Sequence, residues 1–191
     1  MAGSTRQALI DAATQLLDDG GEAGVTLREV GRRAGVSHNA PYKHFTDKDD
    51  LLAAVAAREL DAYARILIDA RRDGRELAYA MRGYVARALA YPRRFRLVYR
   101  PWQGDYDDLR RAADAAWSAL LEAVDVEREG GKLPATVEST RVAELIRALA
   151  NGVIDLEFAG HLNKDQQATM SPDGLVADFL ALLGDQAGVQ R

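Results

Sequence analysis

The chain of 191 residues contains no cysteine, so it can form neither a disulfide framework nor a reactive thiolate. No apolar run approaches the ~18 residues that a membrane helix needs, and charged residues interrupt the short apolar run near the N-terminus. We therefore expect a cytoplasmic protein without a secretory signal or a membrane contact. The alternation of apolar and polar residues that marks a half-buried strand never lasts more than a few residues, which disfavours β-structure.

An excess of basic residues is also absent, because the net charge is −4. This balance excludes a polycation that coats nucleic acid without specificity. Hydrophobic residues make up 48% of the chain, which is enough to build a packed core. The charge is uneven, however, since residues 26–48 hold five basic and two acidic residues. A locally positive surface on an acidic protein is typical of specific binding in a DNA groove.

Apolar residues recur at helical spacing along almost the whole chain, which predicts an all-α protein. The first helix should end at Gly20-Gly21, and a short second helix should begin at Thr26, with Glu29 completing a capping box. Gly35 should end that helix, after which Ser37 caps a third. Asp47 should cap a long fourth helix that ends near residue 73, and further helices are expected at about 76–90, 92–100, 105–128, 136–162 and 172–184.

The second and third helices are separated only by the turn 34–36, which predicts a helix-turn-helix. Pro41 falls early in the third helix, where we expect the loss of one hydrogen bond to be tolerated. Several side chains there suit DNA. Asn39 can pair with adenine, and Lys43 can reach guanine or a phosphate. Phosphate donors are expected at Tyr42 and His44, and at Thr26 and Lys48 beside helix N-termini.

The segment TLREVGRRAGVSHNAPYKHFTDKDDLLAAV resembles the DNA-binding domain of the TetR family of bacterial regulators. The match is carried by family-specific residues at family spacing: Thr26, Gly35, Val36, Ser37, Tyr42, His44, Phe45, Lys48 and Leu51. The resemblance implies phosphate contacts from Thr26, Tyr42, His44 and Lys48. It implies contacts with base edges from Arg28, His38, Asn39 and Lys43, and an apolar contact between Ala40 and a thymine methyl. Ser37 lies at the margin of this surface.

The rest of the chain resembles the family's C-terminal domain, which implies that a small-molecule effector releases the DNA. The stretches 88–99 and 148–162 are similar to a subtype named for a Trp-His-Gly signature, although Asn151 precedes Gly152 where that subtype often has histidine. Aromatic residues gather in this half, as in helical bundles that enclose an apolar pocket. The candidate ligand residues are Tyr84, Phe95, Tyr99, Trp102, Trp117 and Asn151.

The last two helices carry wide apolar stripes, which predict a helical hairpin that meets its copy in a two-fold interface. The interface candidates are Val142, Leu145, Leu149, Val153, Leu156, Leu175, Phe179 and Leu183. The expected organisation is a helix-turn-helix DNA-binding domain at 1–48, a helical effector-binding and dimerisation domain at 49–186, and a disordered tail at 187–191. The expected partners are a palindromic double-stranded DNA operator, a second copy and an effector.

Three other interpretations remain open. A helical small-molecule-binding protein without DNA binding would not need the basic residues of 26–48. A transcriptional activator of the same fold fits as well as a repressor, because the sequence does not locate the operator. An enzyme is disfavoured, since no nucleophile–base set, phosphate loop or metal cluster stands out. We expect no cofactor and no metal, because His38 and His44 are six residues apart and lie on different faces of a helix.

Overall fold

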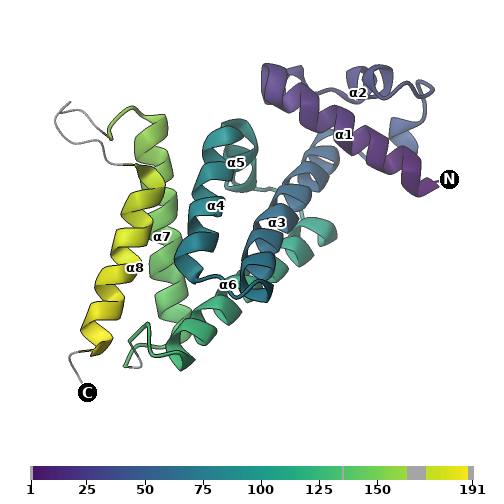
Figure 1. Cartoon of the computed structure of the whole chain (residues 1–191). Helices are drawn as coiled ribbons and strands as arrows, with labels where there is room; N and C mark the ends of the chain where they lie inside the picture. Colours follow the sequence, from purple (N-terminus) through teal and green to yellow (C-terminus); the bar gives the residue numbers. More distant parts are fainter. Residues whose placement is uncertain (1, 135, 163–170, 189–191) are drawn as a thin grey trace. The chain divides into compact units, whose positions relative to one another are not determined.

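A computed structural model describes residues 2–134, 136–162 and 171–188, and all regular structure in these ranges is helical, as predicted (Figure 1). None of these helices is both long and apolar enough to span a membrane. The elements, in chain order, are α1 (Ala2–Gly20), the 3-10 turn η1 (Glu22–Gly24), α2 (Leu27–Arg33), the 3-10 turn η2 (Pro41–Lys43), α3 (Lys48–Arg72), α4 (Leu77–Ala90), α5 (Pro92–Val98), α6 (Asp107–Glu129), α7 (Ser139–Phe158) and α8 (Pro172–Gly188).

The chain divides into two compact units. The first comprises Met1–Asp61 and Tyr91–Asp114, and the second comprises Ala62–Ala90 and Ala115–Arg191. The first unit therefore contains more than the DNA-binding domain expected at 1–48. Of the expected tail at 187–191, residues 187 and 188 close α8, and the remainder lies outside the described residues.

The core of the first unit joins α1 and α2 to the start of α3 and to α5. Leu9, Leu17, Val30 and Phe45 are almost completely buried there. Leu97 of α5 belongs to the same cluster, which explains why residues 91–114 group with the N-terminal helices. Burial of such side chains contributes roughly 1.5–3 kcal/mol each.

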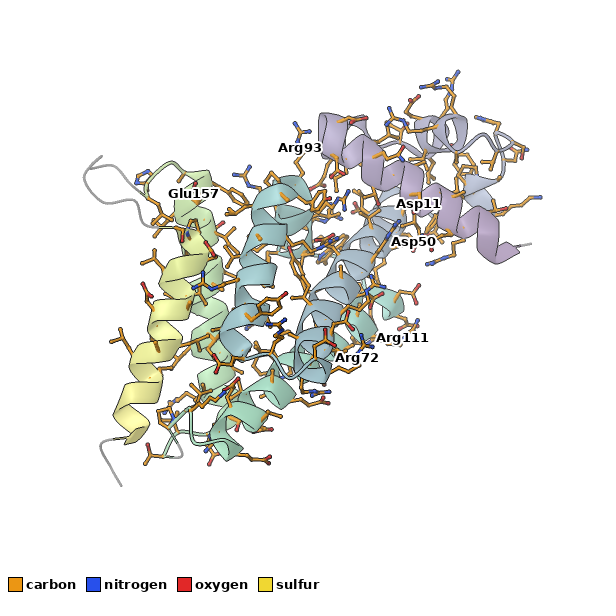
Figure 2. The ribbon with its side chains drawn as sticks, in the orientation of Figure 1. Asp11, Asp50, Arg72, Arg93, Arg111 and Glu157 are labelled. Carbon is orange, nitrogen blue, oxygen red and sulfur yellow. The ribbon has the colours of Figure 1, made fainter. Side chains whose placement is uncertain are left out.

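Arginine side chains fasten α5 to the end of α1. The guanidinium of Arg94 donates from Nε to Oδ1 of Asp18 over 2.9 Å, and its Nη1 lies 3.9 Å from the buried carboxylate of Glu59 on α3. Arg93 donates to the backbone carbonyl of Asp18, and Figure 2 shows its side chain beside the C-terminal end of α1. These contacts tie α5 to the N-terminal helices by charge as well as by apolar packing.

The second unit is built around α4, α7 and α8, which pack against one another. In Figure 1, α7 and α8 lie side by side and run in opposite directions. Ile146 and Ile154 of α7 and Val176 of α8 are fully buried. The ring of Tyr84 on α4 lies 4.5 Å from that of Tyr63, measured between centroids.

A proline ring holds the segment after α2 against that helix. Pro41 and Gly31 are both buried, and the first side-chain atom of any larger residue at position 31 would lie 2.9 Å from Cγ of Pro41. Gly31 therefore permits a contact that a larger side chain would push apart. Phe45, which is 2% exposed, anchors the other end of the segment in the core.

We expect Gly31→Val to separate the segment from α2, because its branched side chain would overlap the proline ring. The free energy of unfolding should fall by about 1–3 kcal/mol, as in other overpacked sites. Urea unfolding measures this change. Gly20→Val is the matched control, since no atom lies within 4 Å of a side chain begun there. Equal stability of the two variants would contradict the role given to Gly31.

Candidate nucleic-acid interface

The N-terminus of α2 is capped as the sequence predicted. Thr26 has an extended backbone, and its hydroxyl accepts a hydrogen bond of 3.2 Å from the backbone N–H of Glu29. The carboxylate of Glu29 does not complete the expected capping box but accepts from Arg32 over 2.9 and 2.5 Å. A hydroxyl that accepts one bond can still donate its proton, so Thr26 retains a donor for a phosphate.

The turn after α2 also follows the prediction. Gly35 has a φ of +67°, in the left-handed region that side chains disfavour. The backbone N–H of Val36 then donates to the carbonyl of Gly31 over 3.1 Å, which closes the end of the helix.

The α-helix predicted to open at Ser37 is wrong. Residues 37–40 form a turn, and a 3-10 turn follows at Pro41–Lys43. Proline has no backbone N–H, so the carbonyl of Ser37 accepts from Ala40 over 2.9 Å, and the carbonyl of Ala40 accepts from Lys43 over 3.2 Å. The predicted tolerance of Pro41 therefore fails, because the proline replaces a regular helix with a chain of tighter bonds. We call residues 37–44 the reading segment.

The reading segment presents polar side chains to the surface. Tyr42 is 55% exposed, and its ring contacts that of His38 edge-on with centroids 6.2 Å apart. Among the ten residues predicted to contact DNA, the exposed ones are Thr26, Arg28, Ser37, His38, Asn39, Tyr42 and Lys43, while Ala40, His44 and Lys48 are half-buried. All ten belong to the first unit.

Ion pairs distinguish the cations of this surface. Arg32 pairs with Glu29, and Arg33 lies 2.6 Å from Asp19. By contrast, no ion pair engages Arg28 or Lys43 within the described part of the chain. These two cations thus keep their full charge for a ligand from solution, and phosphate is the anion that duplex DNA offers.

Lys48 is in a different position. Its ammonium donates to the backbone carbonyl of Glu22 over 2.5 Å, so it fastens the start of α3 to η1. One of its three donor protons is used there, and two remain. The start of α3 is capped as predicted, since Oδ1 of Asp47 accepts from the N–H of Asp50 over 2.8 Å.

The six predicted ligand residues do not share one unit. Tyr84, Trp117 and Asn151 belong to the second unit, where the Tyr84 hydroxyl donates to Oδ1 of Asn151 over 2.7 Å. Phe95, Tyr99 and Trp102 belong to the first unit. Phe95 is 3% exposed, and Trp102 packs against the core of that unit. A cavity of about 360 Å³ in the second unit is lined by none of the six.

Of the predicted interface residues, those on α7 lie on one side of the helix but differ in exposure. Val142 and Val153 are 3% and 4% exposed and belong to the core of the second unit, because α7 turns that face toward α4 and α8. Leu145 and Leu156, each three residues further along the helix, are 49% and 46% exposed and lie at the solvent-facing edge of that buried face. Leu149, and Leu175, Phe179 and Leu183 on α8, are half-buried.

Sequence reasoning missed two features. Leu182 on α8 is 65% exposed, and its spacing of three residues from Phe179 would have placed it on the same stripe. Glu127 and Lys132 line the cavity of the second unit. Their spacing in the sequence matches no known binding motif, so the sequence alone does not identify them.

Two family models match the chain. The model described as bacterial regulatory proteins, tetR family, matches residues 9–55, and the model described as tetracyclin repressor-like, C-terminal domain, matches residues 75–179. The chain is 27% identical to an HTH-type transcriptional regulator, SrpR, of Pseudomonas putida, over 95% of this chain and 86% of the relative. It is also 27% identical to an uncharacterized HTH-type transcriptional regulator of Haemophilus influenzae, over 81% of this chain and 80% of the relative.

Solved structures show the same fold. A protein of unknown function from Rhodococcus sp. RHA1 matches with a TM-score of 0.77 and 25% identity. The match covers 95% of this chain and 94% of the Rhodococcus chain. SmeT, the repressor of the multidrug efflux pump SmeDEF of Stenotrophomonas maltophilia, matches with a TM-score of 0.63 and 23% identity. The match covers 93% of this chain and 88% of SmeT.

Proposed function

The chain belongs to the TetR family of bacterial regulatory proteins, and from that premise we propose that it is a cytoplasmic repressor. In this proposal it binds a palindromic operator as a dimer and leaves the DNA when a small-molecule effector binds. Membership of the family makes the chain a DNA-binding transcriptional regulator of the helix-turn-helix type and not an enzyme. Repression, rather than activation, is favoured by the likeness to SmeT, which is described as a repressor.

The observation that carries the proposal is the polar reading segment, together with two cations, Lys43 in the segment and Arg28 on α2, that form no ion pair in the described part of the chain. Arg28 and Lys43 supply charge, and the anchors Pro41 and Phe45 hold the backbone that presents the segment. We assign Arg28, His38, Asn39 and Lys43 to base edges, and Thr26, Tyr42, His44 and Lys48 to phosphates. Ala40 faces a thymine methyl, and Ser37 lies at the edge of the interface.

Dimerisation supplies the second reading segment. One short segment reads only a few base pairs, whereas two segments held one helical turn of DNA apart, about 34–36 Å, read both halves of a palindrome. The exposed leucines Leu145 and Leu156 on α7 and Leu182 on α8 support these helices as the contact between copies. The Trp-His-Gly subtype of the C-terminal domain stays a prediction.

We expect the double variant Arg28→Ala, Lys43→Ala to weaken binding to every duplex, because two unpaired cations are removed. The slope of log affinity against log salt should become shallower by about 0.9 for each lost phosphate contact and by less for a base contact. Fluorescence anisotropy across a salt series measures it. Arg58→Ala is the control, since Arg58 is already paired with Asp11 outside residues 26–48. If the double variant has the same slope as the unaltered chain, Arg28 and Lys43 do not contact DNA.

Asn39→Ala should affect sequence preference instead of overall affinity. Loss of a bidentate pair with adenine should cost about 1–3 kcal/mol at one base pair, with other duplexes bound as before. Competition binding against a set of single-base operator variants measures this pattern. Tyr42→Phe is the companion variant, because it removes only a phosphate-binding hydroxyl and should weaken all sequences alike. A uniform loss in Asn39→Ala would contradict its assignment to a base.

Leu156→Glu should convert the dimer to a monomer, because it places a charge in the apolar stripe. Sedimentation velocity at micromolar concentration distinguishes the two states, and operator affinity should fall with the dimer. Ile68→Glu is the control, because it places the same charge at an exposed apolar residue outside the proposed interface. Ile68 is 42% exposed and lies on α3, not on α7 or α8. A dimer that survives Leu156→Glu would place the interface elsewhere.

A further inference from the structure

The cavity of about 360 Å³ in the second unit lies outside every residue that the proposed function uses. Its walls come from the start of α4, the end of α6, the turn that follows α6, and α8. Its volume falls at the lower end of the range of small-molecule pockets, about 300–1,000 Å³. A second hollow of about 20 Å³ shares Glu76, Leu77 and Glu127 with it, so these residues separate two spaces.

A buried carboxylate faces the cavity. Glu127 is 9% exposed, and its Oε1 accepts a hydrogen bond of 2.8 Å from the backbone N–H of Leu77. Leu77 is the first residue of α4, so this N–H has no partner within its helix and favours a negative charge. A carboxylate in a mostly buried setting is costly unless a cation lies near it.

The cation that the chain itself supplies is only loosely placed. The ammonium of Lys132 lies 3.6 Å from Oε2 of Glu127 and 2.9 Å from Oε1 of Glu76. The hydrogen bond from Lys132 to Glu76 raises the pKa of Lys132 above its ordinary value, so the side chain is charged at neutral pH. Two carboxylates and one ammonium leave the site with a net charge of −1. The side chains of Lys132 and Glu76 are 54% and 66% exposed, so their pairing is weak and can be displaced.

The remaining walls are apolar. Leu133 and Leu180 are 3% and 8% exposed, and they face the cavity together with Leu77, Ala177 and Ala181. A ligand that fills this space must combine one positive charge with a compact hydrocarbon body, because an anion would meet two carboxylates and a purely polar ligand would lose its water against leucine.

We propose that this cavity binds an organic monocation, with its ammonium on Glu127 and its apolar body against Leu133 and Leu180. Lys132 then turns to Glu76, with which it already makes its shorter contact. Binding at this site does not depend on the proposed function. Its use as the effector site does.

Three compounds with one body and different head groups test the site: cyclohexylmethylamine, cyclohexylmethanol and cyclohexanecarboxylate. Calorimetric titration of the full chain should give an affinity for the amine at least about tenfold above that for the alcohol, as expected for one charged hydrogen bond to a mostly buried carboxylate. The carboxylate should not bind. Equal affinities for amine and alcohol would overturn the proposal, and so would the absence of amine binding.

Variants locate the binding at Glu127. Glu127→Gln keeps the acceptor for Leu77 but removes the charge, and it should abolish the preference for the amine. Glu122→Gln is the matched control, because it removes the same charge from the same helix at an exposed side chain paired with Arg71. Lys132→Gln should tighten amine binding severalfold by removing the internal competitor. Identical titrations for Glu127→Gln and Glu122→Gln would place the amine elsewhere.

Operator affinity measured with and without the amine separates the two proposals. A fall in DNA affinity that is lost in Glu127→Gln supports the effector role. Amine binding with unchanged DNA affinity supports the site and overturns that role. Failure of the chain to bind any duplex overturns the proposed function without affecting the amine titration.

Discussion

The ring of Pro41 rests on the only position of α2 that has no side chain, and the DNA-binding surface depends on this contact. The proline prevents a regular helix, because it cannot donate the bond that Ser37 would otherwise accept. The same ring compensates for that loss by fixing the reading segment against Gly31, while Phe45 holds the far end in the core. A short and irregular segment is therefore anchored at two points, on α2 and in the core.

What distinguishes the cations of the first unit is whether they are paired with carboxylates. The chain is acidic overall, and most arginines of the first unit are bound to carboxylates, as Arg94 is to Asp18 and Arg100 is to Glu22. These pairs hold helices together and contribute little net field. Arg28 and Lys43 form no ion pair in the described part of the chain, so two positive charges of the predicted DNA-binding set are left uncompensated. Specific binding benefits, because the rest of an acidic surface repels phosphate.

The sequence predicted the helices well, because apolar spacing, caps and glycines act locally. Thr26, Gly35 and Asp47 do what their residue types indicate. The sequence mispredicts the reading segment, because a proline at position 41 predicts the loss of one hydrogen bond, whereas its effect extends to the carbonyls of Ser37 and Ala40. The buried and exposed residues of the α7 stripe are not distinguished by sequence either, since Val142 and Leu145 are both apolar neighbours on one side of the helix and only packing against α4 and α8 distinguishes them. The cavity around Glu127 is formed by three segments that are far apart in the sequence. No local sequence pattern predicts that they come together.

The central claim is that paired copies of this surface read DNA sequence. Selection of bound duplexes from a pool of random sequence tests it most directly, because the protein itself then chooses its site. We predict that the recovered duplexes share an inverted repeat whose half-sites are separated by one helical turn or a multiple of it. Recovery of duplexes with no common motif, even at low salt, would contradict the claim.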